Sequence, residues 1–528
     1  MYAPNFFFKL IIRPSRGDVY ERERRLKQGM APTFCSRCED AVDEGCDPRD
    51  ELAELDAMSE RLRLKRYTIK RKINRYHSPI IRHLPPDVMS TIFEFCLADF
   101  TDYQYQYLLY NDGLFLPLSL GAICSYWRDI AWSTPSLWSS LVVRVPSRDS
   151  HIVTGIAQEW LARSGQLPLS ICISSIFYNN TVSALANIIN QYSTRWYNLD
   201  LRIPNRYYQC FHATDNHAPI LKSIQFHCLN NAIDLNFQLT CPRLERANLS
   251  FVRMRGIKIQ WDNLTHLTLH SISILDFFRI LRKTPRLVFC KVSGFCSRYK
   301  GQNTGTLVLT SLRSLQLITS SATGFLNNLI APHLEEFSLP NYYHPSIEAV
   351  TSFLRRSACS LRSFTMILNT FPPYFEGFMS LLQSMPSLNT LSITTWGNTT
   401  RSILQVVAKV LSSQSTSLQE GFLPNLKILE YSGRLLPGNY DDLYSLSPAD
   451  NAVHGPFHLL KLDPHPATRI PKNVISYLSS LVERGVAVDI LSKSDSEDIL
   501  QSSIDYYRWR EDSLCRDWAD NLDSSLFS

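Results

Sequence analysis

The stretch LTHLTLH, residues Leu264 to His270, has leucine at its first, fourth and sixth positions. The same degenerate pattern recurs along the chain, with copies that start 20 to 38 residues apart. The other copies begin at Trp196, Leu221, Leu244, Leu287, Leu312, Leu334, Leu361, Leu388 and Leu426. One copy is too short to bury its own apolar face, so neighbouring copies must cover each other. The pattern therefore predicts a stack of short strands.

This repeat resembles the leucine-rich repeat. The resemblance implies an α/β fold in which residues 146–492 form an irregular leucine-rich-repeat solenoid, a right-handed α/β horseshoe, with helices such as 346–358 and 400–414 behind the strands. The asparagine that usually follows the strand is matched at Asn369 but is replaced at Val252, Ile272, Ser320 and Trp396. The repeats are therefore irregular, and a plain α/β domain is the alternative interpretation.

Upstream of the repeats lies SPIIRHLPPDVMSTIFEFCLADF, from Ser78 to Phe100. Pro85 and Pro86 predict a helix start, because a proline at the first helical position loses no hydrogen bond. Asp87 places a carboxylate in the positive first turn of that helix. A broad apolar stripe follows, so the helix needs a cover. The later stretch FLPLSLGAICSYWRDIAWSTPSLWSSLVVRV predicts a second helix that ends at Pro135, followed by a short turn that carries Trp138.

These two stretches together resemble the F-box domain in the form common in mushroom-forming fungi, here over residues 78–145. The resemblance implies docking on the Skp adaptor of an SCF-type cullin-RING ubiquitin ligase, so that the chain is a non-catalytic subunit that captures a protein substrate with its repeats. Residues 98–115 are an insertion relative to the compact form. By position, the adaptor contacts would be Ile81, Leu84, Pro85, Pro86, Val88, Ile92, Phe93, Leu97, Cys124, Trp127 and Trp138. A repeat scaffold without ligase engagement is the alternative.

Residues 35–77 combine cysteines with a charged helix. Residues 39–60 hold ten acidic side chains and one basic one, whereas residues 61–75 hold eight basic and no acidic ones. Leu55, Leu62, Ile69 and Tyr76 recur every seven residues, which predicts either a short coiled coil or a helix that lies on the next domain. No aromatic platform interleaves the basic run, so we do not expect nucleic acid as a partner.

Cys35 and Cys38 form a Cys-x-x-Cys pair, but the second pair that tetrahedral zinc needs is missing. We therefore expect no metal and no cofactor. Thirteen cysteines without regular spacing predict reduced thiols in a cytoplasmic or nuclear protein, and no apolar segment reaches the length of a membrane span. No motif of a phosphate loop, nucleophile elbow, zinc protease or dinucleotide site is present, so we expect no catalytic residue.

The ends of the chain lack repeats. We expect residues 1–34 to be a disordered N-terminal extension and residues 493–528 to be an acidic C-terminal cap or tail.

The residues between the repeated leucines predict the substrate-binding surface. In a leucine-rich solenoid these residues form the exposed sheet face, where recognition is unconstrained by the core. Between the copies at Leu312 and Leu426 this face and its loops offer charges of both signs and aromatic side chains, namely Glu335, Glu336, Tyr342, Arg362 and Trp396. An ordinary solvated sheet face is the alternative interpretation.

Overall fold

The computed structural model describes residues 48–77, 83–97, 116–228, 235–295, 305–318, 323–341, 347–368, 375–395, 423–433, 458–464, 470–483, 485–490 and 498–509. The chain divides into two compact units. The first consists of residues 1–142 and 158–167, and the second of residues 143–157 and 168–528. Cys35, Cys38, the insertion 98–115, Ile81, Tyr342, Trp396 and the expected helix 400–414 lie outside the described residues.

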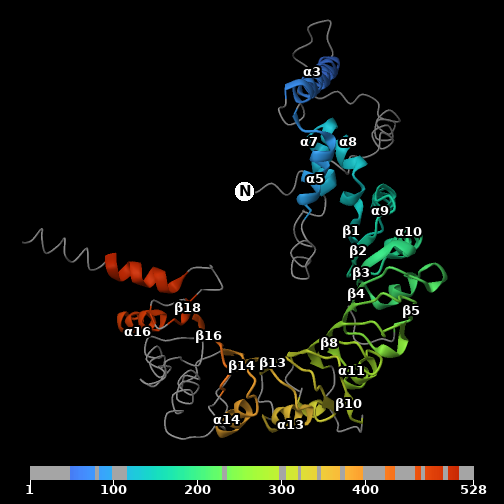
Figure 1. Ribbon diagram of the computed structural model, residues 1–528. Helices are drawn as coiled ribbons and strands as arrows, with labels where there is room; N and C mark the ends of the chain where they lie inside the picture. Colours follow the sequence, from blue (N-terminus) through green and yellow to red (C-terminus); the bar gives the residue numbers. More distant parts are fainter. Residues whose placement is uncertain are drawn as a thin grey trace, which may run out of the picture. The chain divides into compact units, whose positions relative to one another are not determined.

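The first unit is helical (Figure 1). Its elements are α3 (Pro48–His77), α5 (Pro86–Phe95), α7 (Leu116–Ile123), α8 (Ser125–Ser133) and the 3-10 turn η2 (Pro135–Trp138). Helix α5 begins as predicted, because Pro85 is extended and Pro86 takes the first helical position. Helix α8 is capped by the Cys124 thiol, which accepts a hydrogen bond from the Trp127 amide at 3.4 Å. The single helix predicted here is in fact two, α7 and α8, because Cys124 between them is extended; Pro135 follows the end of the second one.

Tryptophan side chains form the core of this unit. Trp138 is 2% exposed, and its Nε1 donates to the Ala131 carbonyl oxygen at 2.7 Å. The Trp132 and Trp160 rings meet the Trp138 ring at centroid distances of 5.2 and 4.8 Å. Phe93 of α5 packs on Trp127 of α8 at 5.0 Å. These edge contacts bury large rings against each other and fix α5 to the following helices.

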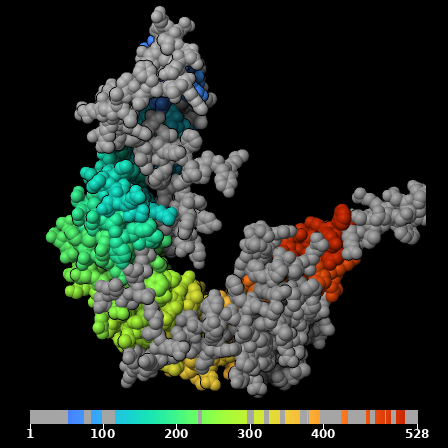
Figure 2. Space-filling model, turned by 180° about the vertical axis from the view of Figure 1, so that it is seen from behind, coloured from blue at the N-terminus to red at the C-terminus, as the bar shows by residue number. Residues whose placement is uncertain are grey.

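A parallel sheet organises the second unit. Fourteen strands join in the order β1-β2-β3-β4-β6-β8-β9-β11-β13-β14-β15-β16-β17-β18, and the pairs from β2 to β18 are parallel. The neighbours follow the order of the chain, apart from β5, β7, β10 and β12, which form two small sheets of their own. In the space-filling view the segments coloured from cyan through green to yellow adjoin one another in the order of the chain (Figure 2). The expectation of an α/β fold with a large parallel sheet is confirmed.

The strands are short. They are β1 (Ser140–Arg144), β2 (Leu169–Ser174), β3 (Trp196–Arg202), β4 (Ser223–His227), β5 (Phe237–Leu239), β6 (Arg246–Ser250), β7 (Ile257–Ile259), β8 (His266–Ile272), β9 (Phe289–Phe295), β10 (Leu307–Val308), β11 (Ser314–Ile318), β12 (Leu329–Ile330), β13 (Glu336–Asn341), β14 (Ser363–Leu368), β15 (Thr390–Thr395), β16 (Ile428–Gly433), β17 (Leu459–Pro464) and β18 (Ala487–Ile490).

Buried leucines follow the pattern of the sequence. Leu264, Leu267 and Leu269, the first, fourth and sixth residues of LTHLTLH, are each 0% exposed. Because the register is parallel, Leu267 and Leu269 pair with Ala247 and Leu249 of β6 and continue as a row across the sheet. Rows of buried aliphatic side chains at equal depth hold adjacent strands together.

Helices connect many of the strands. They are α9 (His151–Arg163), α10 (Asn180–Asn190), α11 (Ile274–Leu281), α12 (Thr323–Leu326), α13 (Ile347–Ser357), α14 (Phe375–Gln383) and α16 (Lys472–Glu483). Helix α13 confirms the helix expected at 346–358, and α11, α13 and α14 lie on the same side of the strands (Figure 1). The described part of the connection from β4 to β6 instead carries β5, and the connection from β6 to β8 carries the turn η6 (Met254–Gly256) and β7. A helix therefore does not back every strand.

In the C-terminal segment, residues 499–509 are helical. Ser503 of this helix is 0% exposed, and its hydroxyl accepts a hydrogen bond from the Ile470 amide at 3.1 Å. This contact holds the helix against residue 470, which begins the segment that leads into α16. Within the described ranges, no helix is long and apolar enough to cross a membrane.

Candidate functional site

One face of α5 is an apolar surface in contact with solvent. Val88 and Ile92 are 40% and 42% exposed, and Phe95 is 85% exposed. Pro85 and Pro86 are also exposed and continue this surface at the start of the helix. We refer to Pro85, Pro86, Val88, Ile92 and Phe95 as the α5 patch. A phenylalanine that leaves most of its ring in water loses the free energy of burial, so this patch is a candidate for contact with a partner.

The helical period explains why the patch forms. Val88, Ile92 and Phe95 are spaced by four and three residues and therefore share one face of α5. Met89 and Phe93 share a different face, and both are 1% exposed. Helix α5 thus has two apolar faces, of which one packs into the first unit and the other stays uncovered. A helix with a single packed face would carry polar side chains on the second one.

Two polar contacts fix α5 beside η2. Ser136 of η2 donates a hydrogen bond to the Glu94 carboxylate, and the Thr134 hydroxyl donates to Ser90 at 3.1 Å. The Tyr126 hydroxyl of α8 also donates to the Leu84 carbonyl oxygen at 3.4 Å. The outward face of α5 is therefore held in place by bonds along its sides, which preorganises it for a partner.

The structure separates the predicted adaptor contacts that it describes into three groups by exposure. Pro85, Pro86, Val88 and Ile92 are exposed, and Leu84, Leu97, Cys124 and Trp127 are half-buried. Phe93 and Trp138 are buried at 1% and 2% exposure, so they support the patch from inside the unit.

The prediction omitted Phe95 and Ile123, which are 85% and 55% exposed. The apolar stripe of the sequence includes Phe95, but only the packing shows that it points outward.

The face of the sheet between the leucines carries polar side chains in rows. One row runs through Gln225, Asn248, Thr268, Lys291 and Gln316 of consecutive strands. Further along the sheet, Arg313 donates to Glu335 at 2.9 Å across neighbouring connections, so Glu335 is already paired with a cation. Glu335 is half-buried, whereas Glu336 and Arg362 are exposed. The predicted substrate residues that the structure describes therefore gather on neighbouring strands, with their charges partly balanced.

A buried polar cluster lies at the other end of this face. Asp200 is 4% exposed, and its carboxylate accepts hydrogen bonds from Arg202 Nε at 3.2 Å and from Arg202 Nη2 at 3.0 Å. The Cys172 thiol donates to Asp200 Oδ2 at 3.6 Å. Burial raises the pKa of Asp200, and the Arg202 guanidinium opposes that shift. Burial also lowers the pKa of His227, with Arg202 acting in the same direction.

Cysteine, histidine and aspartate together invite comparison with a catalytic triad. A nucleophilic cysteine needs a lowered pKa and an accessible sulfur. Cys172 is 1% exposed, and burial and the Asp200 carboxylate raise its pKa well above the ordinary value. Its thiol donates to the carboxylate, and Arg202 occupies both oxygens of that carboxylate. This cluster therefore has the properties of a structural ion pair within β3, to which the Cys172 thiol of β2 is hydrogen-bonded.

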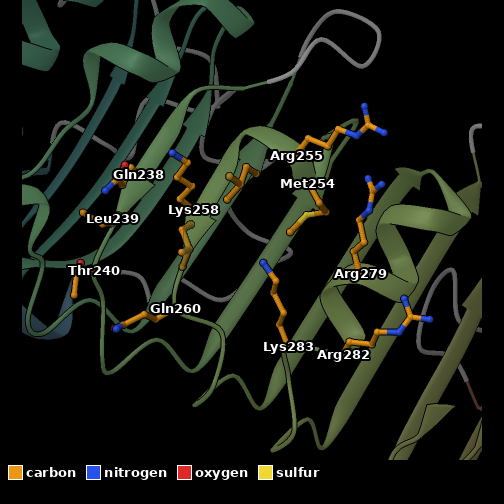
Figure 3. A pocket seen from close by; sticks show the side chains of 12 residues that line it. Gln238, Leu239, Thr240, Met254, Arg255, Lys258, Gln260, Arg279, Arg282 and Lys283 are labelled. Carbon is orange, nitrogen blue, oxygen red and sulfur yellow. The ribbon is translucent and has the colours of Figure 1, made fainter.

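A cationic pocket lies between β5, β7 and α11 (Figure 3). It encloses about 660 Å³, and its apolar floor includes Leu239, Met254 and Ile257. Five of its lining side chains are cationic and none is acidic; the cationic ones are Arg255, Lys258, Arg279, Arg282 and Lys283. No sequence motif indicated this pocket, because its cations come from segments more than twenty residues apart that the fold brings together.

Within the described part of the chain, no group of three or more His, Cys, Asp or Glu side chains is placed to hold a metal ion. No protein-family model matches the chain, and no curated protein matches it in sequence.

Proposed function

We propose that the chain is an F-box substrate receptor of an SCF-type cullin-RING ubiquitin ligase. The helical unit at residues 78–145 is the F-box and binds the Skp adaptor, which connects it to the cullin. The sheet unit is an irregular leucine-rich-repeat solenoid that captures a protein substrate. The chain itself contributes binding and no catalysis, needs no cofactor, and acts in the cytoplasm or the nucleus.

The α5 patch is the observation that carries this proposal. A small helical unit with a complete tryptophan core has no need of further apolar side chains for its own stability, yet Phe95 is 85% exposed and Ile92 is 42% exposed. A few apolar and aromatic residues dominate the affinity of protein interfaces. The patch follows the Leu-Pro-Pro start of α5, where the resemblance to the F-box places the first adaptor contact.

The sheet unit supports the second half of the proposal. Its strands follow the order of the chain, and the first, fourth and sixth residues of the repeat are buried in LTHLTLH. Stacked strand units expose a long, regular face, which is the usual binding surface of solenoid proteins. The polar rows on this face, including Lys291 and Gln316, are available for a protein ligand.

Adaptor binding tests the proposal directly. The full chain is co-expressed with the Skp adaptor, and the complex is isolated by affinity purification. The Ile92→Asp, Phe95→Ala double variant should lose adaptor binding by at least about thirtyfold, since a hot-spot loss is worth about 2 kcal/mol or more. Both side chains are exposed, so the variant should remain folded. Leu84 and Trp127 are less suitable for this test because they are half-buried.

A matched control is available in the second unit. Ile176 and Phe177 are 66% and 41% exposed, and the Ile176→Asp, Phe177→Ala variant removes the same residue types from another surface. This control should retain the adaptor like the unmodified chain. Absence of adaptor binding by the unmodified folded chain would contradict the ligase role and leave the repeat scaffold as the function. Equal adaptor binding by the α5 variant would show that the patch is not the docking surface.

Substrate capture tests the repeats. Once proximity labelling has found a substrate, the Glu335→Ala, Glu336→Ala, Arg362→Ala variant should lose its capture and keep the adaptor. A variant with Glu348→Ala and Arg355→Ala removes charges from the exposed side of α13 instead and should capture substrate normally. If the sheet variant captures substrate as well as this control, the binding site lies elsewhere on the chain.

A further inference from the structure

The cationic pocket has a much higher density of positive charge than the chain as a whole. The full sequence has a formal net charge of +6, whereas twelve lining residues of this pocket alone include five cationic side chains. One of them, Arg279, donates to Asp276 Oδ1 at 2.9 Å. Like charges gathered at one site repel each other, and an anionic ligand relieves that repulsion.

The cationic side chains reach this pocket from three separate elements. Arg255 belongs to η6 and Lys258 to β7, while Arg279, Arg282 and Lys283 come from the C-terminal turn of α11 and the residues after it. In the close-up, Arg255 and Arg279 point to the same side of the pocket, and Lys283 extends toward Met254 (Figure 3). Cations at a helix C-terminus interact favourably with the helix dipole, which explains the three on α11. It does not explain Arg255 and Lys258, which line the same pocket from η6 and β7.

We propose that this pocket binds a compact ligand with several phosphate groups. Three of the five cations are arginines, whose planar guanidinium groups bind phosphate oxygens through two parallel hydrogen bonds. The volume of about 660 Å³ is that of a small-molecule site. None of its lining residues is aromatic, so the pocket lacks the stacking surface that single-stranded nucleic acid uses.

Titration calorimetry of the full chain with inorganic tripolyphosphate tests this site. The Arg255→Gln, Lys258→Gln variant should bind at least about tenfold more weakly, because it loses two of the five cations that can make charge-assisted hydrogen bonds to phosphate. Both side chains are exposed, which keeps the fold out of the result. The Arg243→Gln, Arg286→Gln variant removes two exposed cations that do not line the pocket and should bind normally.

Two sources of the phosphate groups are distinguished by a second arm. The full chain is mixed with phosphatidylcholine vesicles that contain phosphatidylinositol bisphosphate, and the vesicles are floated. If the chain floats with them and tripolyphosphate releases it, the ligand is a lipid headgroup. If the chain binds tripolyphosphate but not the vesicles, the ligand is soluble. The proposal is overturned if tripolyphosphate does not saturate, if both variants weaken binding equally, or if a short single-stranded RNA displaces tripolyphosphate at equal phosphate concentration. None of these outcomes depends on the adaptor.

Helix α3 carries a second, independent inference. The side chains from Leu52 to Ile73 are all exposed, as is Tyr76. Eight positions with alternating spacings of three and four residues form a seam along α3, namely Leu52, Leu55, Ser59, Leu62, Arg66, Ile69, Ile73 and Tyr76. Six of these side chains are apolar, and the other two are Ser59 and Arg66. The six apolar side chains are 50% to 62% exposed. From Leu52 to Ile73 this seam is therefore exposed, which is unfavourable for apolar side chains at coiled-coil positions.

We infer that α3 pairs with α3 of a second copy in the antiparallel direction. In that arrangement Leu52 meets Tyr76, Leu55 meets Ile73, Ser59 meets Ile69 and Leu62 meets Arg66, so that every layer contains an apolar side chain. The acidic half, up to Glu60, lies beside the basic half that begins at Arg61. Parallel pairing would place Arg66 opposite Arg66 and the two basic halves together, which is destabilising.

Sedimentation velocity of the full chain tests this dimer. The Leu55→Ser, Leu62→Ser variant should be monomeric, whereas Leu64→Ser, which removes a 59% exposed leucine outside the seam, should remain dimeric. Neutralising Lys65, Lys70 and Lys72 to Gln should weaken an antiparallel dimer and strengthen a parallel one. A monomer at micromolar concentration and low salt overturns the dimer, and tighter association of the Lys→Gln variant overturns its direction.

Discussion

The contact between α7 and α8 allows a sharp prediction about one methyl group. A Cβ atom added at Gly121 of α7 would lie 2.1 Å from Trp132 Cζ3 and 2.6 Å from Trp132 Cη2 of α8. A Cβ added at Gly155 of α9 would meet no atom within 4 Å. Gly121→Ala and Gly155→Ala therefore make the same chemical change in a helix with opposite steric consequences.

The expected magnitudes follow from the surroundings of Trp132. Alanine is about 1 kcal/mol better than glycine inside a helix, so Gly155→Ala should stabilise its helix by about that amount. At Gly121 the Trp132 ring must move, although it packs against Trp138 at 5.2 Å and lies 5.3 Å from the Arg163 guanidinium carbon. Disturbing these contacts and overpacking the core costs about 2 kcal/mol. We expect Gly121→Ala to destabilise the first unit by about 1 kcal/mol.

Hydrogen exchange measured by mass spectrometry on the full chain reports local opening free energies for α7, α8 and α9 separately. Exchange in α7 and α8 should accelerate in Gly121→Ala, and exchange in α9 should slow in Gly155→Ala. In a Trp132→Leu background the ring is gone, so Gly121→Ala should become stabilising, a coupling that a double-mutant cycle measures. Slower exchange in the single Gly121→Ala variant, or the same effect in both backgrounds, would refute the reasoning.

Three further predictions follow from other contacts. Gly256→Ala should unfold the loop beside the cationic pocket, because its Cβ would lie 1.5 Å from the Leu235 carbonyl oxygen; protease resistance equal to that of Gly155→Ala would contradict this. Burial lowers the pKa of His270 below its ordinary value of 6.5, and the charge of Lys291 acts in the same direction. The unfolded chain therefore binds a proton at this position more readily than the folded chain, so the free energy of unfolding should fall as the pH drops below about 6.5. The urea midpoint of His270→Gln should fall less over the same pH range, and an identical fall in both proteins would contradict this role of His270. Iodoacetamide should label the exposed Cys96 in the native chain, whereas Cys290, whose pKa burial raises to about 12, should react only after unfolding. Because Cys96 directly follows the α5 patch, a bound adaptor should slow its labelling.

Sequence periodicity predicted the features that depend on spacing alone. The leucine pattern indicated which residues of LTHLTLH are buried, and Pro86 indicated where α5 begins. Periodicity could not tell which of two apolar faces of α5 points inward, because Phe93 and Phe95 are equally apolar and only the packing against Trp127 decides between them. Nor could it find the cationic pocket, since Lys258 and Arg279 become neighbours only through the fold.

The two faces of α5 make the stability of this unit and its proposed adaptor binding separable by mutation. Met89 and Phe93 are 1% exposed, so replacing them with alanine creates cavities and should lower stability by about 2–5 kcal/mol. Ile92 and Phe95 are exposed, so replacing them changes stability by about 0.5 kcal/mol or less. If α5 serves only the fold, loss of any partner should track the loss of stability across both pairs of variants. If α5 also serves the adaptor, the outward pair should lose the adaptor at unchanged stability, a combination that a purely structural helix cannot produce.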